Sequence, residues 1–118
     1  MTPAARSVCY FGYYLYLVGL CLLVIPNQFL KLNQMPETQE VWIRVVGTLV
    51  LAIAYYYHRT GAAGYRPFLL LTVHARVFVF LAFVAFVALK FAPPMLIVFG
   101  VIDLLGAIWT WLSLRKEA

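Results

Sequence analysis

Four ionisable side chains lie within otherwise apolar stretches of this 118-residue chain, namely Arg44, His74, Arg76 and Asp103. An isolated charge at the centre of a bilayer costs at least about 2.5–3.5 kcal/mol, so such residues normally face the protein interior and find partners there. A buried carboxylate and guanidinium can neutralise each other, hold a polar head group or, at the carboxylate, exchange a proton. We therefore expect these residues to form a buried polar centre.

The distance of two of these residues from their helix starts predicts that they meet. Arg76 lies nine residues after Pro67, and Asp103 lies nine residues after Pro94. At 1.5 Å per residue each is about 13 Å inside a hydrocarbon core about 30 Å thick, and the two enter from opposite sides. We expect an Arg76–Asp103 pair at mid-membrane. Arg44, about 5 Å inside its own helix, is expected to reach the same carboxylate or to extend outward to water.

Small and polar residues surround Asp103 at intervals of three and four positions. They are Gly100, Asp103, Gly106, Ala107, Thr110 and Ser113. Residues at these intervals share one face of a helix, and small residues are enriched where membrane helices pack together. The pattern predicts that this face points inward and that Thr110 belongs to the polar network.

Tyr13 and His74 complete the set of candidate ligand-binding or network residues. Tyr13 belongs to a tyrosine-rich face that could line a pocket, although close aromatic packing is the favoured interpretation. His74 precedes Arg76 by two residues, so the two side chains point about 160° apart on a helix. Because the chain has two histidines and no acidic residue spaced near them, no metal site is predicted. No nucleophile–base pair or phosphate loop is visible either, so a catalytic role is not expected.

The elements that must position these residues are expected to be membrane-spanning helices. The chain is 65% hydrophobic and 11% charged, which is more apolar than a soluble domain of this size could enclose. Since one crossing takes roughly 20 apolar residues, we predict a single all-α domain over residues 1–118, an integral membrane antiparallel four-helix bundle. The expected helices cover about 8–25, 41–57, 67–91 and 95–114.

Two connections complete the predicted fold. Within residues 26–40, scattered apolar side chains indicate a short segment along the membrane interface. Residues 58–66 contain two glycines and are expected to form a polar turn.

Basic residues near the predicted helix ends are unevenly distributed. The side that holds both termini has Arg6, Arg59, Arg66, Arg115 and Lys116, and the other side has Lys31 and Lys90. Because cytoplasmic loops are enriched in Lys and Arg, both termini are expected in the cytoplasm. The net charge of +5 is scattered between apolar segments, so binding to nucleic acid is not expected.

The order of these features resembles a known family. A Pro-x-x-Phe-Leu turn covers residues 26–30, an arginine and a glycine open the second helix over 44–47, and Arg76 and Asp103 lie in the third and fourth helices. In this the chain resembles the DoxX-like group of small bacterial four-helix membrane proteins, whose members usually have glycine where Ala75 stands and glutamate where Asp103 stands. The resemblance implies a bacterial inner-membrane location, and some members are implied to be subunits of quinone-linked oxidoreductases. No cofactor is evident from the residues themselves, and quinone is the one that the resemblance allows.

Three roles remain open for the buried centre. It could be a structural network that fixes helix register, in which case removal of one partner would strand the other. It could hold the head group of a lipid-like or quinone-like molecule whose tail lies among aromatic side chains. It could relay protons through Asp103 and His74 in a proton-coupled small-molecule transporter. The sequence thus predicts a non-catalytic membrane protein, surrounded by lipid, that binds such a ligand or serves as an accessory subunit of a larger complex or homo-oligomer.

Overall fold

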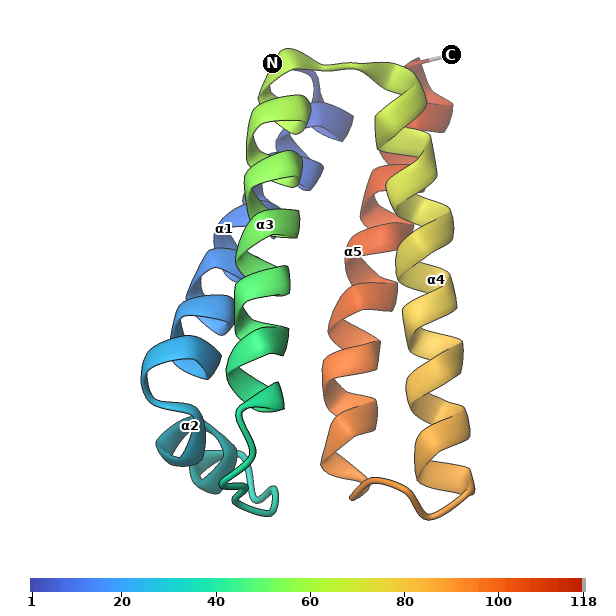
Figure 1. Ribbon diagram of the computed structural model, residues 1–118. Coiled ribbons are helices and arrows are strands. Elements are labelled where there is room, and N and C mark those ends of the chain that lie inside the picture. Colours follow the sequence, from blue (N-terminus) through green and yellow to red (C-terminus); the bar gives the residue numbers. More distant parts are fainter. Residues whose placement is uncertain (118) are drawn as a thin grey trace.

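The computed structural model describes residues 1–117, and the regular structure in this range is helical, as predicted. Figure 1 shows both termini and the α3–α4 connection at one end, here called the terminal end, with α2 and the α4–α5 turn at the opposite end, the turn end. The helices are α1 (Pro3–Val24), α2 (Pro26–Leu32), α3 (Trp42–Ala63), α4 (Arg66–Ala88) and α5 (Met95–Glu117).

Three of the long helices, α1, α4 and α5, are long and apolar enough to cross a membrane. The fourth, α3, is not among them, although it has 22 residues. Its last turns contain Tyr55, Tyr56, Tyr57, His58 and Arg59, which are the polar and amphipathic residues that lower its hydropathy.

The pair α1 and α3 packs with the two backbones in close approach. A Cβ atom added at Gly12, Gly47 or Gly61 would lie 2.7–2.9 Å from a backbone nitrogen of the opposite helix. A Cβ atom at Gly19 would lie 3.0 Å from the carbonyl oxygen of Gly47. These contacts recur along both helices, so small residues hold α3 against α1 over its length.

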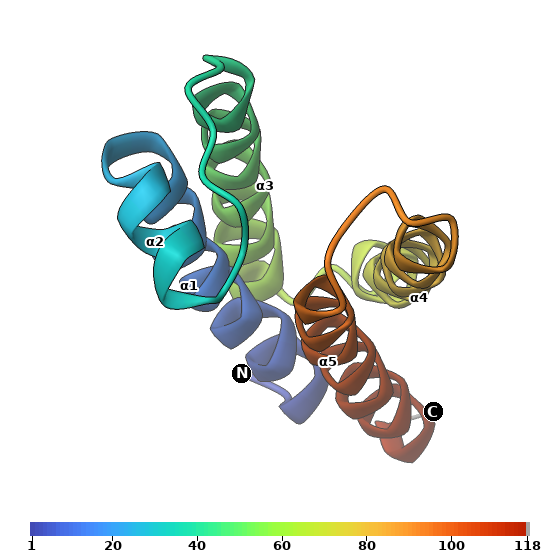
Figure 2. The same ribbon diagram turned by 90° about the horizontal axis from the view of Figure 1, so that it is seen from below.

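The second pair is α4 and α5, and it joins the first pair mainly through contacts between α1 and α5. By contrast, α3 and α4 touch little. Figure 2, viewed from below, shows α5 beside α1 while α3 and α4 stand apart. The two pairs therefore join along one seam, which lies between α1 and α5.

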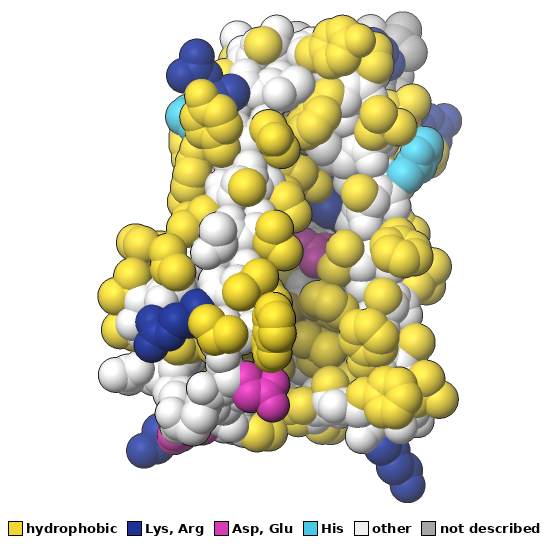
Figure 3. Space-filling view, in the orientation of Figure 1, with side chains coloured by type: hydrophobic (Ala, Val, Ile, Leu, Met, Phe, Trp, Pro, Cys, Tyr) yellow, Lys and Arg dark blue, Asp and Glu magenta, His cyan; other side chains and the backbone are white. Residues whose placement is uncertain are grey.

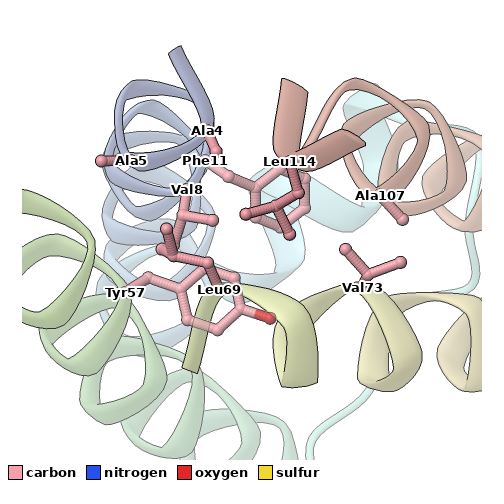
Figure 4. Close-up of a cluster of buried hydrophobic side chains, with 9 residues drawn as sticks. All are labelled: Ala4, Ala5, Val8, Phe11, Tyr57, Leu69, Val73, Ala107 and Leu114. Carbon is pink, nitrogen blue, oxygen red and sulfur yellow. The ribbon is translucent and has the colours of Figure 1, made fainter. Parts of the chain in front are cut away.

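The hydrophobic core lies at the terminal end, where all four long helices contribute. Figure 4 shows Tyr57 of α3 beside Leu69 of α4, with Val73 facing Ala107 of α5. The full cluster is Ala4, Ala5, Val8, Phe11, Tyr57, Leu69, Val73, Ala107 and Leu114. This core closes the terminal end of the space between the two helix pairs.

The polar turn predicted over residues 58–66 is mostly helix. α3 continues to Ala63, and only Gly64 and Tyr65 separate it from α4. Gly64 has a φ of 70°, the left-handed conformation in which glycine commonly ends a helix. Gly61, expected in the turn, instead lies within α3 against α1. The glycine therefore serves helix packing and not chain reversal.

Other helix ends also differ from the predicted bounds. α1 begins at Pro3 and not near residue 8, because the Thr2 side chain accepts a hydrogen bond of 3.1 Å from the Ala5 amide and proline fits the first turn. α4 ends at Ala88, shortly before Lys90 with its φ of 64°. The segment expected along the interface contains α2.

Candidate ligand-binding groove

Arg76 is only 2% exposed and is the largest of the almost completely buried side chains, and its position is set by hydrogen bonds within α4 and across to α5. Its Nε donates to the Thr72 carbonyl oxygen at 3.1 Å. Its Nη2 donates to the Thr72 hydroxyl at 3.0 Å and to the Thr110 hydroxyl at 2.9 Å. Thr72 lies one turn earlier on the same face of α4, so the local helix geometry directs the guanidinium toward α5.

The network continues from α5 to α1. Ser7 donates its hydroxyl hydrogen to the Ala4 carbonyl oxygen at 2.7 Å, and its oxygen lies 2.6 Å from the Thr110 hydroxyl. Because the hydrogen of Ser7 is already used, Thr110 must donate to Ser7 and accept from Arg76. The hydrogen bonds therefore run in one direction through three helices, from Arg76 to Thr110 to Ser7 to Ala4.

One part of the Arg76 guanidinium has no protein partner. Nη1 is buried and makes no hydrogen bond to any described residue. A Cβ atom at Gly106 would lie 2.9 Å from Nη1, and the Phe11 ring centre lies 4.8 Å from the Arg76 Cζ. An unpartnered buried donor on a charged group carries an unusually large desolvation cost, which a ligand acceptor would offset.

A groove of about 660 Å³ lies beside this network, between the two helix pairs. Apolar and aromatic side chains from all five helices line it, from Phe11 and Tyr57 at the terminal end to Phe29 and Leu96 at the turn end. Figure 3 looks into this groove, where one basic and one acidic side chain lie among hydrophobic ones. The charged residues of its lining are Arg76 and Asp103.

The direct Arg76–Asp103 pair that helix depth predicts is not formed. Both residues line the same groove, but the three hydrogen bonds of Arg76 go to Thr72 and Thr110 and none goes to Asp103. The physical reason is that two threonines, one on each helix, are closer partners for Nε and Nη2. The carboxylate of Asp103 is therefore left facing the groove.

Arg44 does not reach Asp103. It is exposed on α3 near the turn end, and its Nη1 donates to the Leu23 carbonyl oxygen of α1. The close packing of α3 on α1 brings that carbonyl within reach. Arg44 is not part of the groove lining.

Tyr13 and His74 also lie outside the groove lining. His74 is exposed on α4. Tyr13 is 49% exposed on α1, where its hydroxyl accepts a hydrogen bond of 3.5 Å from Cys9 and its ring centre lies 5.4 Å from that of His58. Thus the structure brings together Arg76, Asp103 and Thr110, and leaves the other three candidates elsewhere.

Sequence reasoning missed several residues of the site. Ser7 falls before the predicted start of the first helix, and Tyr57 at the predicted end of the second, yet Ser7 is 1% exposed and Tyr57 is buried against Phe11. A serine among alanine and valine is a polar interruption of the same kind as Asp103. Because α1 begins at Pro3, Ser7 is such an interruption within the helix, and this pattern was the available signal for its place in the polar network.

The groove presents one guanidinium and one carboxylate among apolar side chains. Its one cation and one anion give it no net formal charge, so it suits a neutral or zwitterionic polar group better than a singly charged one. Within residues 1–117 no three His, Cys, Asp or Glu side chains are grouped so that they could hold a metal ion.

A scan against protein-family models and searches of curated proteins and of solved structures found no match. The function proposed below therefore rests on the residues and geometry of the groove.

Proposed function

We propose that this chain is an integral membrane protein whose four long helices cross the bilayer as an antiparallel bundle. α1, α4 and α5 have the length and hydropathy for crossing. The glycine contacts that hold α3 against α1 along their length support a place for α3 beside α1 in the bilayer. Large exposed apolar side chains, which would be costly in water, then face acyl chains; examples are Leu17, Leu20, Leu71, Phe78 and Leu105.

The proposed setting is the bacterial inner membrane with both termini in the cytoplasm. The excess of Lys and Arg at the terminal end supports this orientation. Tagging each terminus and testing its accessibility to a protease in sealed vesicles checks it. Protection of both tags in spheroplasts and cleavage in inverted vesicles is expected, and the reverse pattern would contradict the orientation.

Within that bundle, the groove binds a lipid-like or quinone-like molecule. The observation that carries this proposal is the buried Nη1 of Arg76, which has no partner among the described residues and lies beside an otherwise apolar groove. A head-group oxygen would accept from Nη1, and a hydroxyl would donate to Asp103. A quinol meets both requirements, because one of its ring hydroxyls can accept from Nη1 and another can donate to Asp103, whereas a quinone, whose ring oxygens are carbonyls, meets only the first.

The tail of the ligand would follow the apolar wall toward the turn end. Along α1 the lining runs from Phe11 to Leu22, which is about 16 Å at 1.5 Å per residue. Burial of a chain along this length is favourable at roughly 25 cal/mol per Å² of apolar surface when compared with water. Compared with the bilayer this gain is small, so the polar contacts supply the selectivity.

Mass spectrometry of the protein extracted in mild detergent tests the proposal. A bound amphiphile is expected in the wild type, and retention should fall at least about tenfold in Asp103→Asn, which removes the carboxylate charge. Arg44→Gln, outside the groove, is the charge control and should retain the ligand. Absence of any amphiphile from wild-type protein extracted under several mild conditions would contradict the proposal.

A steric variant separates binding from electrostatics. Ala75 lines the groove and is exposed, so Ala75→Phe fills space beside Arg76 without changing charge. Ala85 is also exposed on α4 but is not in the lining, and Ala85→Phe is the matched control. Loss of the ligand only in Ala75→Phe supports occupation of the groove.

The resemblance to the DoxX-like group extends the proposal to a role as a non-catalytic accessory subunit in a larger complex or homo-oligomer. Gentle solubilisation followed by native mass measurement checks this role. Stable co-purifying chains are expected, and a protein that remains a lone monomer at all concentrations would count against it.

A second candidate is a proton-coupled transporter that uses Asp103. It is favoured by one observation, that the carboxylate faces the groove while Arg76 bonds elsewhere. The relay through His74 lacks such support, because His74 lies outside the groove lining. A pH gradient across proteoliposomes should drive transport of a small molecule in the wild type, and Asp103→Asn should abolish this transport. Unchanged transport in the variant would exclude Asp103 as the proton-carrying group.

A further inference from the structure

A second cavity lies at the terminal end, away from the groove. It has a volume of about 470 Å³ between the start of α4 and the last turns of α5. Its lining consists of Arg66, Pro67, Leu70, Trp111, Leu114 and Arg115. None of these residues lines the groove that contains Arg76 and Asp103.

Two guanidinium groups from different helices lie at this cavity. Arg66 is exposed, and its Nη2 donates to the Leu114 carbonyl oxygen at 3.0 Å, which holds the side chain against α5. Arg115 is also exposed, and its Cζ lies 4.9 Å from the centre of the Trp111 ring. Each contact fixes the position of an arginine while leaving other N–H donors free, because a guanidinium has five.

The rest of the cavity wall is apolar and faces outward. Leu70 and Trp111 are each 43% exposed, and in the proposed membrane orientation they lie below the arginines on the side toward the bilayer. The cavity is thus basic where the helices end and apolar deeper in. Arginine forks match phosphate oxygens, and an exposed apolar wall beneath them matches the first part of an acyl chain.

We propose that this cavity is a site for an anionic glycerophospholipid of the leaflet at the terminal end. Arg66 and Arg115 bind the phosphate, and one acyl chain lies along Leu70 and Trp111. The start of α4, where Tyr65 supplies no side-chain cap, adds the positive end of a helix dipole to the same place. The inference rests on the proposed membrane insertion but not on any ligand in the groove.

Lipid competition in vesicles tests the site. The full chain is reconstituted in phosphatidylcholine vesicles with and without phosphatidylglycerol and extracted in mild detergent. Native mass spectrometry then identifies the lipid that stays bound. Retention of phosphatidylglycerol over phosphatidylcholine is expected. Arg66→Gln with Arg115→Gln should weaken that retention about tenfold, which corresponds to about 1.4 kcal/mol.

A matched control removes the same charge at the same end of the molecule. Arg6 and Arg59 are exposed near the terminal end and do not line the cavity. Arg6→Gln with Arg59→Gln should keep most of the preference for phosphatidylglycerol. Equal loss in the two double variants would overturn the site, because the preference would then come from the general surface charge.

Two further measurements distinguish a lipid site from a free-phosphate site and from loss of folding. Inorganic phosphate added to the wild type should not displace the lipid, and displacement would show a free-phosphate site instead. Arg66→Gln removes the hydrogen bond to Leu114 and could lower the helicity of the protein. In that case the single variant Arg115→Gln replaces the double variant, because the Arg115 side chain contacts the Trp111 ring but makes no hydrogen bond to the described residues. Washing the membranes at alkaline pH separates the two proposals. If only the lipid site is wrong, the chain stays in the membrane; if the proposed membrane insertion is wrong, the wash releases it.

Discussion

Thr110 on α5 accepts a hydrogen bond of 2.9 Å from the guanidinium of Arg76 on α4. The same hydroxyl lies 2.6 Å from Ser7 of α1, so one small side chain connects three helices at the edge of the groove. Thr110 is fully buried. The structure of the polar centre therefore depends more on this threonine than on the carboxylate of Asp103.

Thr110→Val is expected to destabilise the protein by about 2–3 kcal/mol. The substitution keeps the shape but removes both the acceptor for Arg76 and the donor to Ser7, leaving buried polar groups without partners. Unfolding followed by helical circular dichroism in a detergent series measures the change. Thr48→Val is the control, because Thr48 is exposed and bonds only to the Arg44 carbonyl oxygen of its own helix. Equal shifts in the two variants would contradict the role of Thr110.

Gly106→Ala is expected to destabilise the helix packing by about 1–3 kcal/mol. The new methyl group would lie 2.9 Å from both Arg76 Nη1 and the Phe11 ring, so one of them must move. Gly100→Ala is the matched control on α5, since the nearest atom to its methyl group would be 3.3 Å away on the Phe80 side chain. Helix propensity favours alanine at both positions by about 1 kcal/mol. A stabilised Gly106→Ala variant would show that the close approach to Arg76 is not required.

Arg76→Gln is expected to destabilise the protein more than Asp103→Asn does. Arg76 is 2% exposed and makes three hydrogen bonds, whereas Asp103 faces the groove. A double-mutant cycle in the unfolding assay should give a coupling energy below about 1 kcal/mol, because the two side chains are not joined directly. Strong coupling, on the order of 3 kcal/mol or more, would restore the ion pair that helix depth alone predicts.

Gly47→Val is expected to separate α3 from α1 and to cost at least about 2 kcal/mol. The first added carbon would already lie 2.7 Å from the backbone nitrogen of Leu23, which cannot move aside as a flexible side chain could. Ala52→Val on the exposed side of α3 is the control for β-branching. Cross-linking between cysteines placed on α1 and α3 reads the separation directly, and unchanged cross-linking with unchanged stability would refute the close contact.

The helical class and much of the polar centre could be predicted from the sequence. Apolar composition and the interval of three and four residues on the last helix indicated where helices lie and that Asp103 and Thr110 share an inner face. The depth of a residue along its helix, however, fixes only its position across the membrane and not its position beside the neighbouring helices. Which partner a buried arginine selects depends on lateral packing, and here Thr72 and Thr110 lie within hydrogen-bond reach of it.

The packing of α3 shows a second limit. Gly47, Ala54 and Gly61 recur every seven residues, as do Ala5, Gly12 and Gly19, so each set lies on one helix face. That spacing was a signal for the α1–α3 contact. Interpretation of Gly61 as a turn residue hid it, because glycine favours both turns and close helix packing. The same packing of α3 on α1 also decides between the two positions expected for Arg44, because it places the side chain at the Leu23 carbonyl oxygen, exposed and away from Asp103.

The two-residue link between α3 and α4 has a mechanical consequence. Gly64 and Tyr65 alone separate the two helices, so the Cα atoms of Ala63 and Arg66 can be no more than about 11 Å apart. The helix pairs cannot draw apart in parallel at that end. Any widening of the groove must therefore be a rotation of one helix pair about this link. The displacement grows with distance from the link and is largest at the turn end of the helices.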